Sequence, residues 1–280
     1  MKKIIVSLIV AVILLPVIAG GSREIIPNLK KDELRIVSLS PNITEIICSL
    51  GCIENLVGRT DYCDSPAELS KVQSIGSIDN PNLELIISLK PDVVIASSIT
   101  DPSILEKINS AGISTYRFFE EYNGLEGAFN LIIETGDAIG KHEQAAEIVE
   151  MQKIQLEEIK SKTNTVIDKK KCVYLVSWGE FGDFAATGDS FINDILVCAG
   201  GINIASSARF WSISKELLLS EDPQLIFIAE NSSSDFKNIS PYSHLTGIVH
   251  EVDPNIFERQ GINSVSCVEK VAKILYPELF

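Results

Sequence analysis

One stretch of this chain occurs twice, and the repetition limits the folds that the chain can adopt. The first copy, ELIISLKPDVVIA, starts at Glu84, and the second, ELLLSEDPQLIFI, starts at Glu216. In each copy, apolar residues at helical spacing lead to a proline, which ends a helix, and then to consecutive apolar residues. Such a run is typical of a parallel strand buried on both faces. Each copy predicts a helix, a tight turn and a buried strand, and two copies predict two similar lobes.

The rest of the chain continues this alternation. Beyond the two copies, short apolar runs predict strands at 35–39, 53–58, 113–119, 172–177 and 248–252. Helical patterns or turn residues lie between them. Strands that alternate with helices indicate a parallel α/β sheet.

A long amphipathic segment separates the two halves. Residues 142–160 have one apolar face that only Gln152 interrupts. About twenty residues at 1.5 Å each span roughly 30 Å, enough to cross between lobes. We therefore expect an α/β fold of two similar lobes with parallel-type sheets. The expected parts are an N-terminal lobe at 33–123, a helical connection with one long inter-lobe helix at 124–163, and a C-terminal lobe at 170–280.

Residues 1–22 have the pattern of a secretory signal peptide. Lys2 and Lys3 precede an apolar run at 4–19, and small residues follow it. Cleavage is expected after Ala19, with Gly20 or Gly21 as alternatives; the other reading is an uncleaved anchor, for which the run is short. No cysteine follows the run closely, which argues against a lipid anchor. The mature protein is expected in the periplasm or otherwise outside the cytoplasm.

Composition narrows the class of partner. A 45% apolar and 22% charged content is ordinary for a soluble globular protein. The formal net charge of −14 argues against a nucleic-acid partner. Six cysteines are too few for a disulfide framework in a chain of this length. Export permits disulfides, and the expected pair is Cys198 with Cys267.

Motifs for catalysis and metal binding are weak. The sequence Gly188-Asp189-Ser190 is similar to the GDS signature of a serine hydrolase family, but none of the three histidines has an aspartate three residues before it. Ser190 is better explained as a helix cap. The histidines have no metal-ligand spacing, and no phosphate-binding loop occurs. No catalytic residue, metal ligand or cofactor is expected, and an exported hydrolase using Ser190 is the remote alternative.

Aromatic residues at loop ends indicate a ligand site instead. Tyr62 and Trp178 follow expected strands, and Phe210 and Trp211 precede the helix of the second copy. Ligands of open α/β sheets bind at such places, and flat rings suit a large planar ligand.

At this point the chain resembles a known family. RIVSLSPNITEI, VGRTDYCDSP and NLELIISLKPDVVIA, between residues 35 and 96, are similar to the first lobe of ABC-importer substrate-binding proteins for cobalamin, haem and ferric siderophores. The resemblance covers nearly the whole mature chain and is strongest to the cobalamin-binding members. It implies the class III fold of periplasmic binding proteins, in which one rigid long helix joins two lobes and the ligand lies between them with little closure.

The resemblance also assigns roles to residues. It implies that Tyr62 stacks on a corrin ring, that Phe210 or Trp211 faces it from the second lobe, and that Arg259 lies in the cleft. It implies that Glu84 and Glu216 pair with arginines of a membrane permease dimer, which works with an ATPase and is the chain's only link to the membrane. Carboxylate–guanidinium pairs are directional, so two of them would fix the docking orientation.

Some positions depart from the cobalamin-binding pattern. Ile78 and Ser97 stand where two tryptophans are expected, and Arg59, Arg209 and Arg259 could serve an anionic ligand. The resemblance as a whole still predicts a binding protein rather than an enzyme, with a cobalamin-like corrinoid as its ligand. A ferric siderophore or haem is the alternative.

Overall fold

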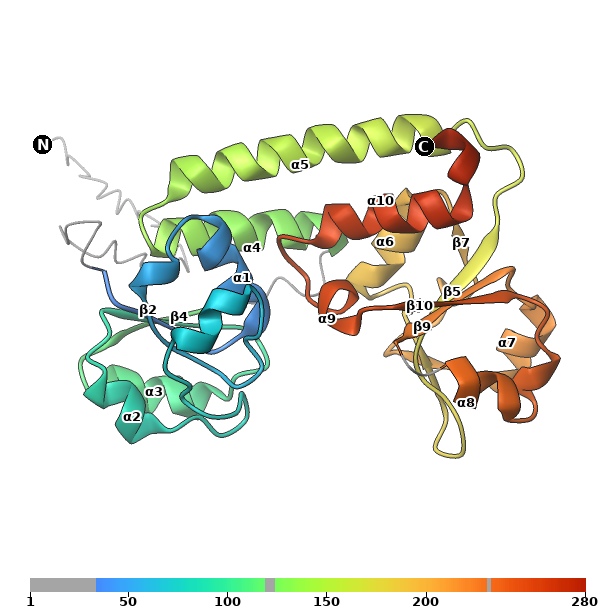
Figure 1. The fold of residues 1–280 in the computed structure, drawn as a ribbon. Coiled ribbons are helices and arrows are strands. Elements are labelled where there is room, and N and C mark those ends of the chain that lie inside the picture. The colour runs from blue at the N-terminus through green and yellow to red at the C-terminus, as the bar shows by residue number, and fades with distance from the viewer. Residues whose placement is uncertain (1–33, 119–123, 231–232) are drawn as a thin grey trace, which may run out of the picture.

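The computed structural model describes residues 34–118, 124–230 and 233–280. The expected signal peptide at 1–22 lies outside the described residues. Among the described helices, none is both long and apolar enough to cross a bilayer. Two α/β lobes lie side by side, both below the long helices at the top of Figure 1.

The N-terminal lobe contains one parallel sheet with the strand order β2-β1-β3-β4. Its strands are β1 (Ile36–Ser38), β2 (Leu56–Arg59), β3 (Val93–Ala96) and β4 (Ser114–Arg117). Its helices are α1 (Pro41–Ser49), α2 (Leu83–Ser88) and α3 (Pro102–Ser110). The sheet is buried on both faces, because Val93 and Ile95 pack into one apolar cluster and Val94 packs into another.

The C-terminal lobe is larger and its sheet is mixed. The order is β10-β9-β5-β6-β8, with β7 beside β5; β6 and β8 run antiparallel, an edge that the sequence did not predict. Its strands are β5 (Lys171–Ser177), β6 (Asp183–Ala185), β7 (Ile202–Asn203), β8 (Ser212–Ile213), β9 (Leu225–Ala229) and β10 (Ile248–Val252). Its helices are α6 (Phe191–Cys198), α7 (Lys215–Glu221), α8 (Ser233–Asn238), α9 (Pro254–Phe257) and α10 (Ser264–Leu275).

The two copies of the repeated sequence form equivalent elements. The first forms α2 and β3, the second forms α7 and β9, and each strand lies inside its sheet. The side chains of Asn82 and Ser214 cap the two helices. Each helix is followed by a residue with positive φ, Lys90 at 48° and Asp222 at 37°, directly before the proline. The expected helix, turn and buried strand are thus present in both lobes.

The equivalence extends to the residues that hold the turns. Arg35 precedes β1, and its side chain donates to carbonyls at the end of α2, while its backbone N–H donates to Asp92 at 2.8 Å. Lys171 starts β5, and its side chain donates to the last carbonyl of α7 at 3.4 Å. Its backbone N–H donates to the side chain of Gln224 at 2.8 Å. Each lobe therefore ties its repeated turn to its first strand.

The expected long helix joins the lobes, and a second helix packs alongside it. α5 (His142–Thr163) has 22 residues and spans about 33 Å, and α4 (Gly124–Ala138) packs alongside it. Asp194 of the C-terminal lobe accepts a hydrogen bond from the N–H of Leu125 at the start of α4. Gln152, the polar residue on the apolar face of α5, donates to the carbonyl of Ile262 at 2.7 Å.

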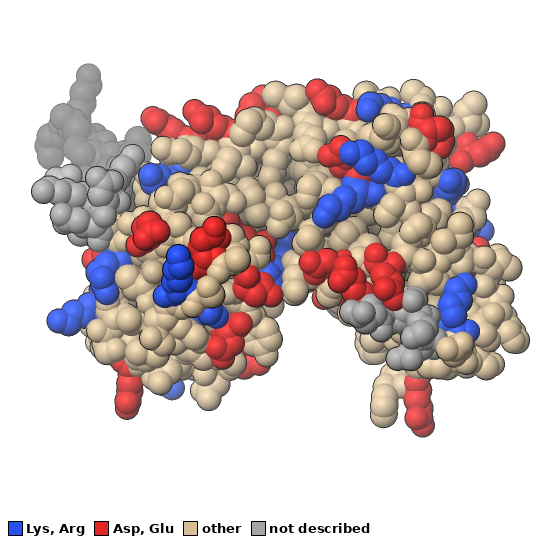
Figure 2. All heavy atoms as spheres, viewed as in Figure 1, with Lys and Arg blue, Asp and Glu red and all other residues tan. Residues whose placement is uncertain are grey.

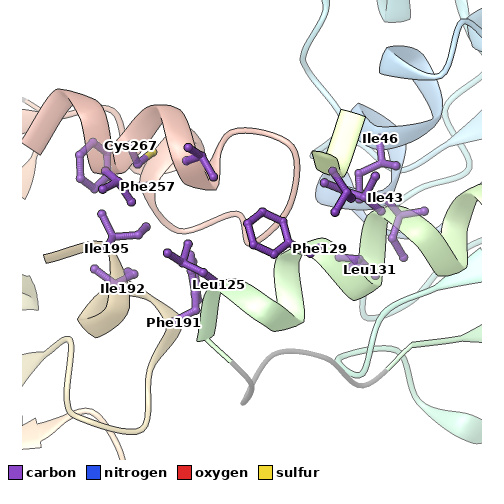
Figure 3. Packing of buried hydrophobic residues seen from close by; sticks show 14 of the residues in the cluster. Ile43, Ile46, Leu125, Phe129, Leu131, Phe191, Ile192, Ile195, Phe257 and Cys267 are labelled. Carbon is purple, nitrogen blue, oxygen red and sulfur yellow. The ribbon is translucent and has the colours of Figure 1, made fainter. Parts of the chain in front are cut away.

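One apolar cluster continues through this connection from lobe to lobe. Leu125 lies beside Phe191 of the C-terminal lobe, and Leu131, further along α4, lies beside Ile43 of the N-terminal lobe (Figure 3). Because all these side chains are buried, moving the lobes apart would expose apolar surface to water. The connection therefore holds the lobes as a rigid pair.

Gly136 allows α4 and α5 to approach each other. A Cβ at this position would lie 2.5 Å from the Cβ of Ala145, closer than side chains can pack. We predict that Gly136→Ala destabilises the protein by about 1–3 kcal/mol, although alanine is the better helix former. Denaturant unfolding would measure this change. Adding Ala145→Gly removes the facing methyl group and should recover much of the loss; equal stability of Gly136→Ala and wild type would contradict the close packing.

Candidate ligand cleft

A cleft of about 510 Å³ lies between the lobes, within the ordinary range for ligand pockets. Figure 2 shows the hollow opening on the side away from α5, with acidic side chains on both of its rims. Both lobes contribute to its walls. The lining residues are Ser40, Pro41, Asn42, Tyr62, Ile78, Ser97 and Ile99 from the N-terminal lobe, and Val176, Asp189, Ser190, Phe191, Trp211, Pro254, Asn255, Glu258, Arg259 and Gln260 from the C-terminal lobe.

Two aromatic rings enter the cleft from opposite lobes. Tyr62, in the loop after β2, is 55% exposed, and Trp211, just before β8, is 36% exposed. Exposed aromatic rings that line a concave site are candidate ligand contacts. The two rings offer flat apolar surfaces to a ligand, as the sequence predicts for Tyr62 and for one of the pair Phe210 and Trp211.

Two of the expected aromatic residues lie outside the cleft lining. Trp178 does not line the cleft, because its ring packs edge-on against Phe236 of the C-terminal lobe at 5.0 Å between centroids. Phe210 is 84% exposed and also lies outside the lining. Consecutive residues in a tight turn point in different directions, so only Trp211 reaches the cleft. Phe210 and Trp211 both have positive φ, which costs an L-residue about 1–2 kcal/mol.

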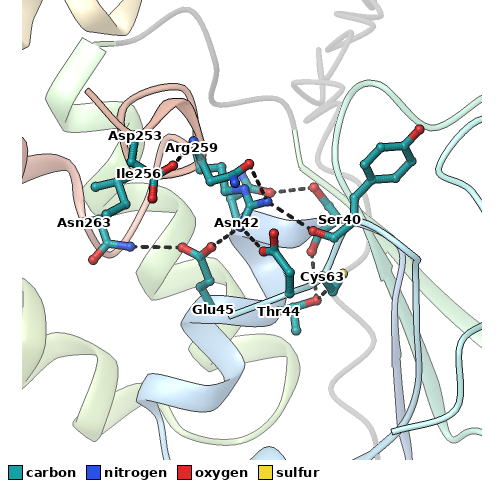
Figure 4. A network of polar contacts seen from close by, with 12 residues as sticks. Ser40, Asn42, Thr44, Glu45, Cys63, Asp253, Ile256, Arg259 and Asn263 are labelled. Carbon is teal, nitrogen blue, oxygen red and sulfur yellow. Dashed lines mark hydrogen bonds and ion pairs between the residues drawn. The ribbon is translucent and has the colours of Figure 1, made fainter. Parts of the chain in front are cut away.

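Arg259 joins the two lobes at the cleft (Figure 4). Its guanidinium donates to Glu45 on α1 and to Asp64 after β2, each at 2.7 Å. It also donates to the carbonyl of Tyr62 at 3.1 Å and to the side chain of Asn255 at 3.0 Å. We call this set the Arg259 clasp. The guanidinium bonds to these four acceptors. It therefore joins the two lobes and fixes the position of the Tyr62 loop.

The two carboxylates of the clasp titrate differently. Burial raises the pKa of Glu45 and outweighs the opposing effect of Arg259. Burial works in the same direction at Asp64, but there the hydrogen bond and charge of Arg259 prevail and lower the pKa. Asp64 therefore adds stability above its unfolded pKa, which is lost as pH falls through the folded pKa. The contribution of Glu45 has the opposite sign and is lost as pH rises through its raised pKa.

The charge inside the cleft is predominantly negative. Of the lining residues described, Asp189, Glu258 and Arg259 are charged, and the arginine is bonded to two carboxylates. Hydrogen bonds from Thr187 and from the backbone N–H of Phe210 lower the pKa of Asp189, so it is ionised at neutral pH.

The other two candidate arginines do not line the cleft. Arg59 donates to the carbonyls of Leu69 and Thr60, and Arg209 donates to those of Ser206 and Ala208. The described lining thus offers no cation that is free of a carboxylate.

The serine of the hydrolase-like motif makes structural contacts. The Ser190 hydroxyl donates to the carbonyl of Thr187 at 2.8 Å and caps α6, and no histidine lines the cleft within the described residues. In the same part of the chain, no cluster of three His, Cys, Asp or Glu side chains could hold a metal ion.

The expected disulfide is absent, which corrects that prediction. Cys198 and Cys267 both carry free thiols. The thiol of Cys267 donates to the carbonyl of Ile256 on α9. Cys198 ends α6, and its thiol interacts with the charge of Lys160 on α5. The two thiols have different neighbours because α6 and α10 present them to different parts of the core.

Glu84 and Glu216 lie outside the cleft. Each is exposed and lies in the first turn of its helix, α2 or α7. Both helices lie in the parts of the lobes that are away from α5 (Figure 1). The structure thus gives the two glutamates equivalent places on the two lobes.

Sequence reasoning missed several polar residues of the cleft. Ser97 contributes to the cleft lining and is 4% exposed, and its buried hydroxyl has no hydrogen-bond partner among the described residues. In the sequence, Ser97 is notable only because it stands where a tryptophan is expected. Asp189 and Glu258 adjoin residues that were singled out, Ser190 and Arg259. Asp189 lies in the loop before α6 and Glu258 directly follows α9. Such positions in connecting segments often carry functional residues.

The Arg259 clasp gives a direct test of the inter-lobe bond. Glu45 is 8% exposed, so Arg259→Met would leave a buried carboxylate without its cation. We expect a loss of about 3–5 kcal/mol in the free energy of unfolding, measured with denaturant. The double variant with Glu45→Gln removes the buried charge and should be more stable than Arg259→Met alone. A single variant as stable as wild type would show that the clasp does not hold the lobes.

Comparison with known proteins agrees with this architecture. Residues 36–239 match the family model described as periplasmic binding protein. An uncharacterised ABC transporter substrate-binding lipoprotein of Bacillus subtilis is 28% identical over 263 residues, which are 90% of this chain and 83% of that protein. The vitamin B12-binding protein of Vibrio campbellii is 29% identical over 204 residues, 72% of each chain. The crystal structure of a periplasmic haem-binding protein of Vibrio cholerae has a TM-score of 0.78 at 20% identity, covering 87% of this chain and 99% of that one. The chain belongs to the periplasmic binding protein family.

Proposed function

We propose that the protein is an exported substrate-binding protein that captures a corrinoid of the cobalamin type and delivers it to an ABC importer. Support comes from the family, from relatives named as substrate-binding or vitamin B12-binding proteins, and from a cleft with an aromatic ring on each wall. The chain binds and delivers its ligand, and ATP hydrolysis belongs to the importer.

The charge of the cleft is the observation that favours a corrinoid. Haem and many ferric siderophores carry carboxylates or other anionic groups, which need a cation when they are buried. The described lining offers only Arg259, which two carboxylates already neutralise, and adds Asp189 and Glu258. A corrin ring carries uncharged amide groups on its edge, which can donate hydrogen bonds to such carboxylates.

Haem is the second candidate, and one observation favours it. Tyr62 presents a phenol in the cleft, and a tyrosine oxygen can ligate haem iron. In a corrinoid complex the same ring would serve only as a stacking surface. The hydroxyl of Tyr62 therefore distinguishes the two ligands.

Delivery would use the two lobes together. Glu84 and Glu216 occupy equivalent first-turn positions, so a permease dimer with two arginine-bearing sites could pair with both. Rigid lobes keep the two carboxylates at a fixed separation, which would make docking specific in orientation.

Calorimetric titration of the mature protein with cyanocobalamin and with haemin tests the ligand. We expect heat of binding with cyanocobalamin, and an affinity about tenfold lower in Trp211→Ala because one stacking surface is lost. Tyr62→Phe should leave the corrinoid affinity unchanged. Phe181→Ala is the matched control, since Phe181 is 95% exposed on the β5–β6 hairpin and does not line the cleft. Binding of haemin alone, with its iron spectrum changed by Tyr62→Phe, would assign haem instead.

Uptake of radiolabelled cyanocobalamin tests the docking pair in cells where each variant replaces the wild-type chain. Removing both carboxylates, with Glu84→Ala and Glu216→Ala together, should lower uptake at least about tenfold while ligand affinity stays unchanged. The matched control changes Glu147 and Glu150, two exposed glutamates on α5, to alanine. Wild-type uptake in the Glu84/Glu216 double variant would remove the proposed docking role.

A further inference from the structure

The turn before β8 holds two consecutive residues in the left-handed region of the backbone. Phe210 has a φ of 59° and Trp211 has a φ of 62°. Residues with a Cβ rarely adopt this conformation, so it persists only where neighbouring groups fix it. The side chain of Trp211 reaches the cleft from this turn.

Two side chains from the neighbouring turn at 187–189 fix both residues. One oxygen of Asp189 accepts a hydrogen bond from the N–H of Phe210 at 3.0 Å, and the other accepts from the hydroxyl of Thr187 at 2.5 Å. A hydroxyl that donates its single proton can still accept. The Thr187 oxygen accepts from the N–H of Trp211 at 3.0 Å. Both left-handed residues are therefore bonded to one Thr–Asp pair.

Gly188 brings the two turns into contact. A Cβ at this position would lie 1.9 Å from the carbonyl oxygen of Ser206 and 2.7 Å from a guanidinium nitrogen of Arg209. The N–H of Gly188 instead donates to the carbonyl of Ala208 at 3.2 Å. In the Gly188-Asp189-Ser190 motif, the glycine permits the approach, the aspartate bonds to the turn, and the serine caps α6.

We propose that Thr187 and Asp189 are positioning residues for ligand recognition, because their pair holds the ring of Trp211 against the cleft. Thr187 is fully buried and bonds to Asp189 and to the N–H of Trp211, so it acts on a ligand through these neighbours. Asp189 lines the cleft, and each of its oxygens accepts one hydrogen bond, from the hydroxyl of Thr187 or from the N–H of Phe210. The inference rests on the proposed function, since it assigns residues that prepare the same cleft.

Nuclear magnetic resonance of the nitrogen-labelled protein tests the positioning without any ligand. The chain has two tryptophans, so two indole N–H signals are expected, and Trp211→Phe assigns them. In Asp189→Ala and in Thr187→Val, the heteronuclear NOE of the Trp211 indole should fall toward that of a mobile side chain. Trp178, packed against Phe236, is the internal reference. Thr187→Ser keeps the hydroxyl and should keep the wild-type value. A Trp211 indole as ordered in both the Ala and Val variants as in wild type would overturn the proposal.

Calorimetry with cyanocobalamin tests the consequence for binding. Affinity should fall about tenfold in Asp189→Ala and Thr187→Val and stay at the wild-type value in Thr187→Ser. Asp222→Ala is the matched control, because Asp222 also accepts from a backbone N–H and a hydroxyl, both of Thr246, but lies outside the cleft lining. Wild-type affinity in Asp189→Ala and Thr187→Val would contradict the inference and leave the proposed function standing. A wild-type protein that binds neither cyanocobalamin nor haemin would contradict the proposed function, while the resonance experiment still decides the positioning.

Discussion

The cleft depends on the apolar core that passes from one lobe to the other through α4 and α5. Leu125 and Leu131 of α4 are both buried, one against each lobe. Each Å² of this surface that reached water would cost about 25 cal/mol, so large separations of the lobes are strongly opposed. The width of the cleft is therefore set when the chain folds, and recognition must come from groups that are already in place.

The Arg259 clasp adds direction to this non-directional packing. A buried ion pair adds little net stability, because removing both charges from water offsets most of their attraction. Its value lies in geometry, since Glu45, Asp64 and the carbonyl of Tyr62 must all meet one planar guanidinium. The clasp fixes one aromatic wall of the cleft, and the Thr187–Asp189 pair is proposed to fix the other. Both sets of polar groups bond to the backbone of an aromatic residue that lines the cleft.

The repeated helix and strand could be predicted in detail because their causes are local. A capping residue, apolar spacing and a proline act within a few residues of one another, so α2, β3, α7 and β9 were expected, and the fold class is confirmed. Within the cleft, Tyr62 and Trp211 could be expected from their places beside strand and helix ends. Trp178 could not be told from them, because only the packing of Phe236 decides that its ring turns into the lobe.

By itself, the sequence determined the two similar lobes, the long helix between them and the matched positions of Glu84 and Glu216, all of which follow from spacing along the chain. The tertiary structure decided which charges remain available in the cleft. Arg259 reads as a free cation in the sequence, yet its two carboxylate partners lie 214 and 195 residues away along the chain. Contacts over such separations depend on how the lobes pack, and no local pattern of residues encodes them.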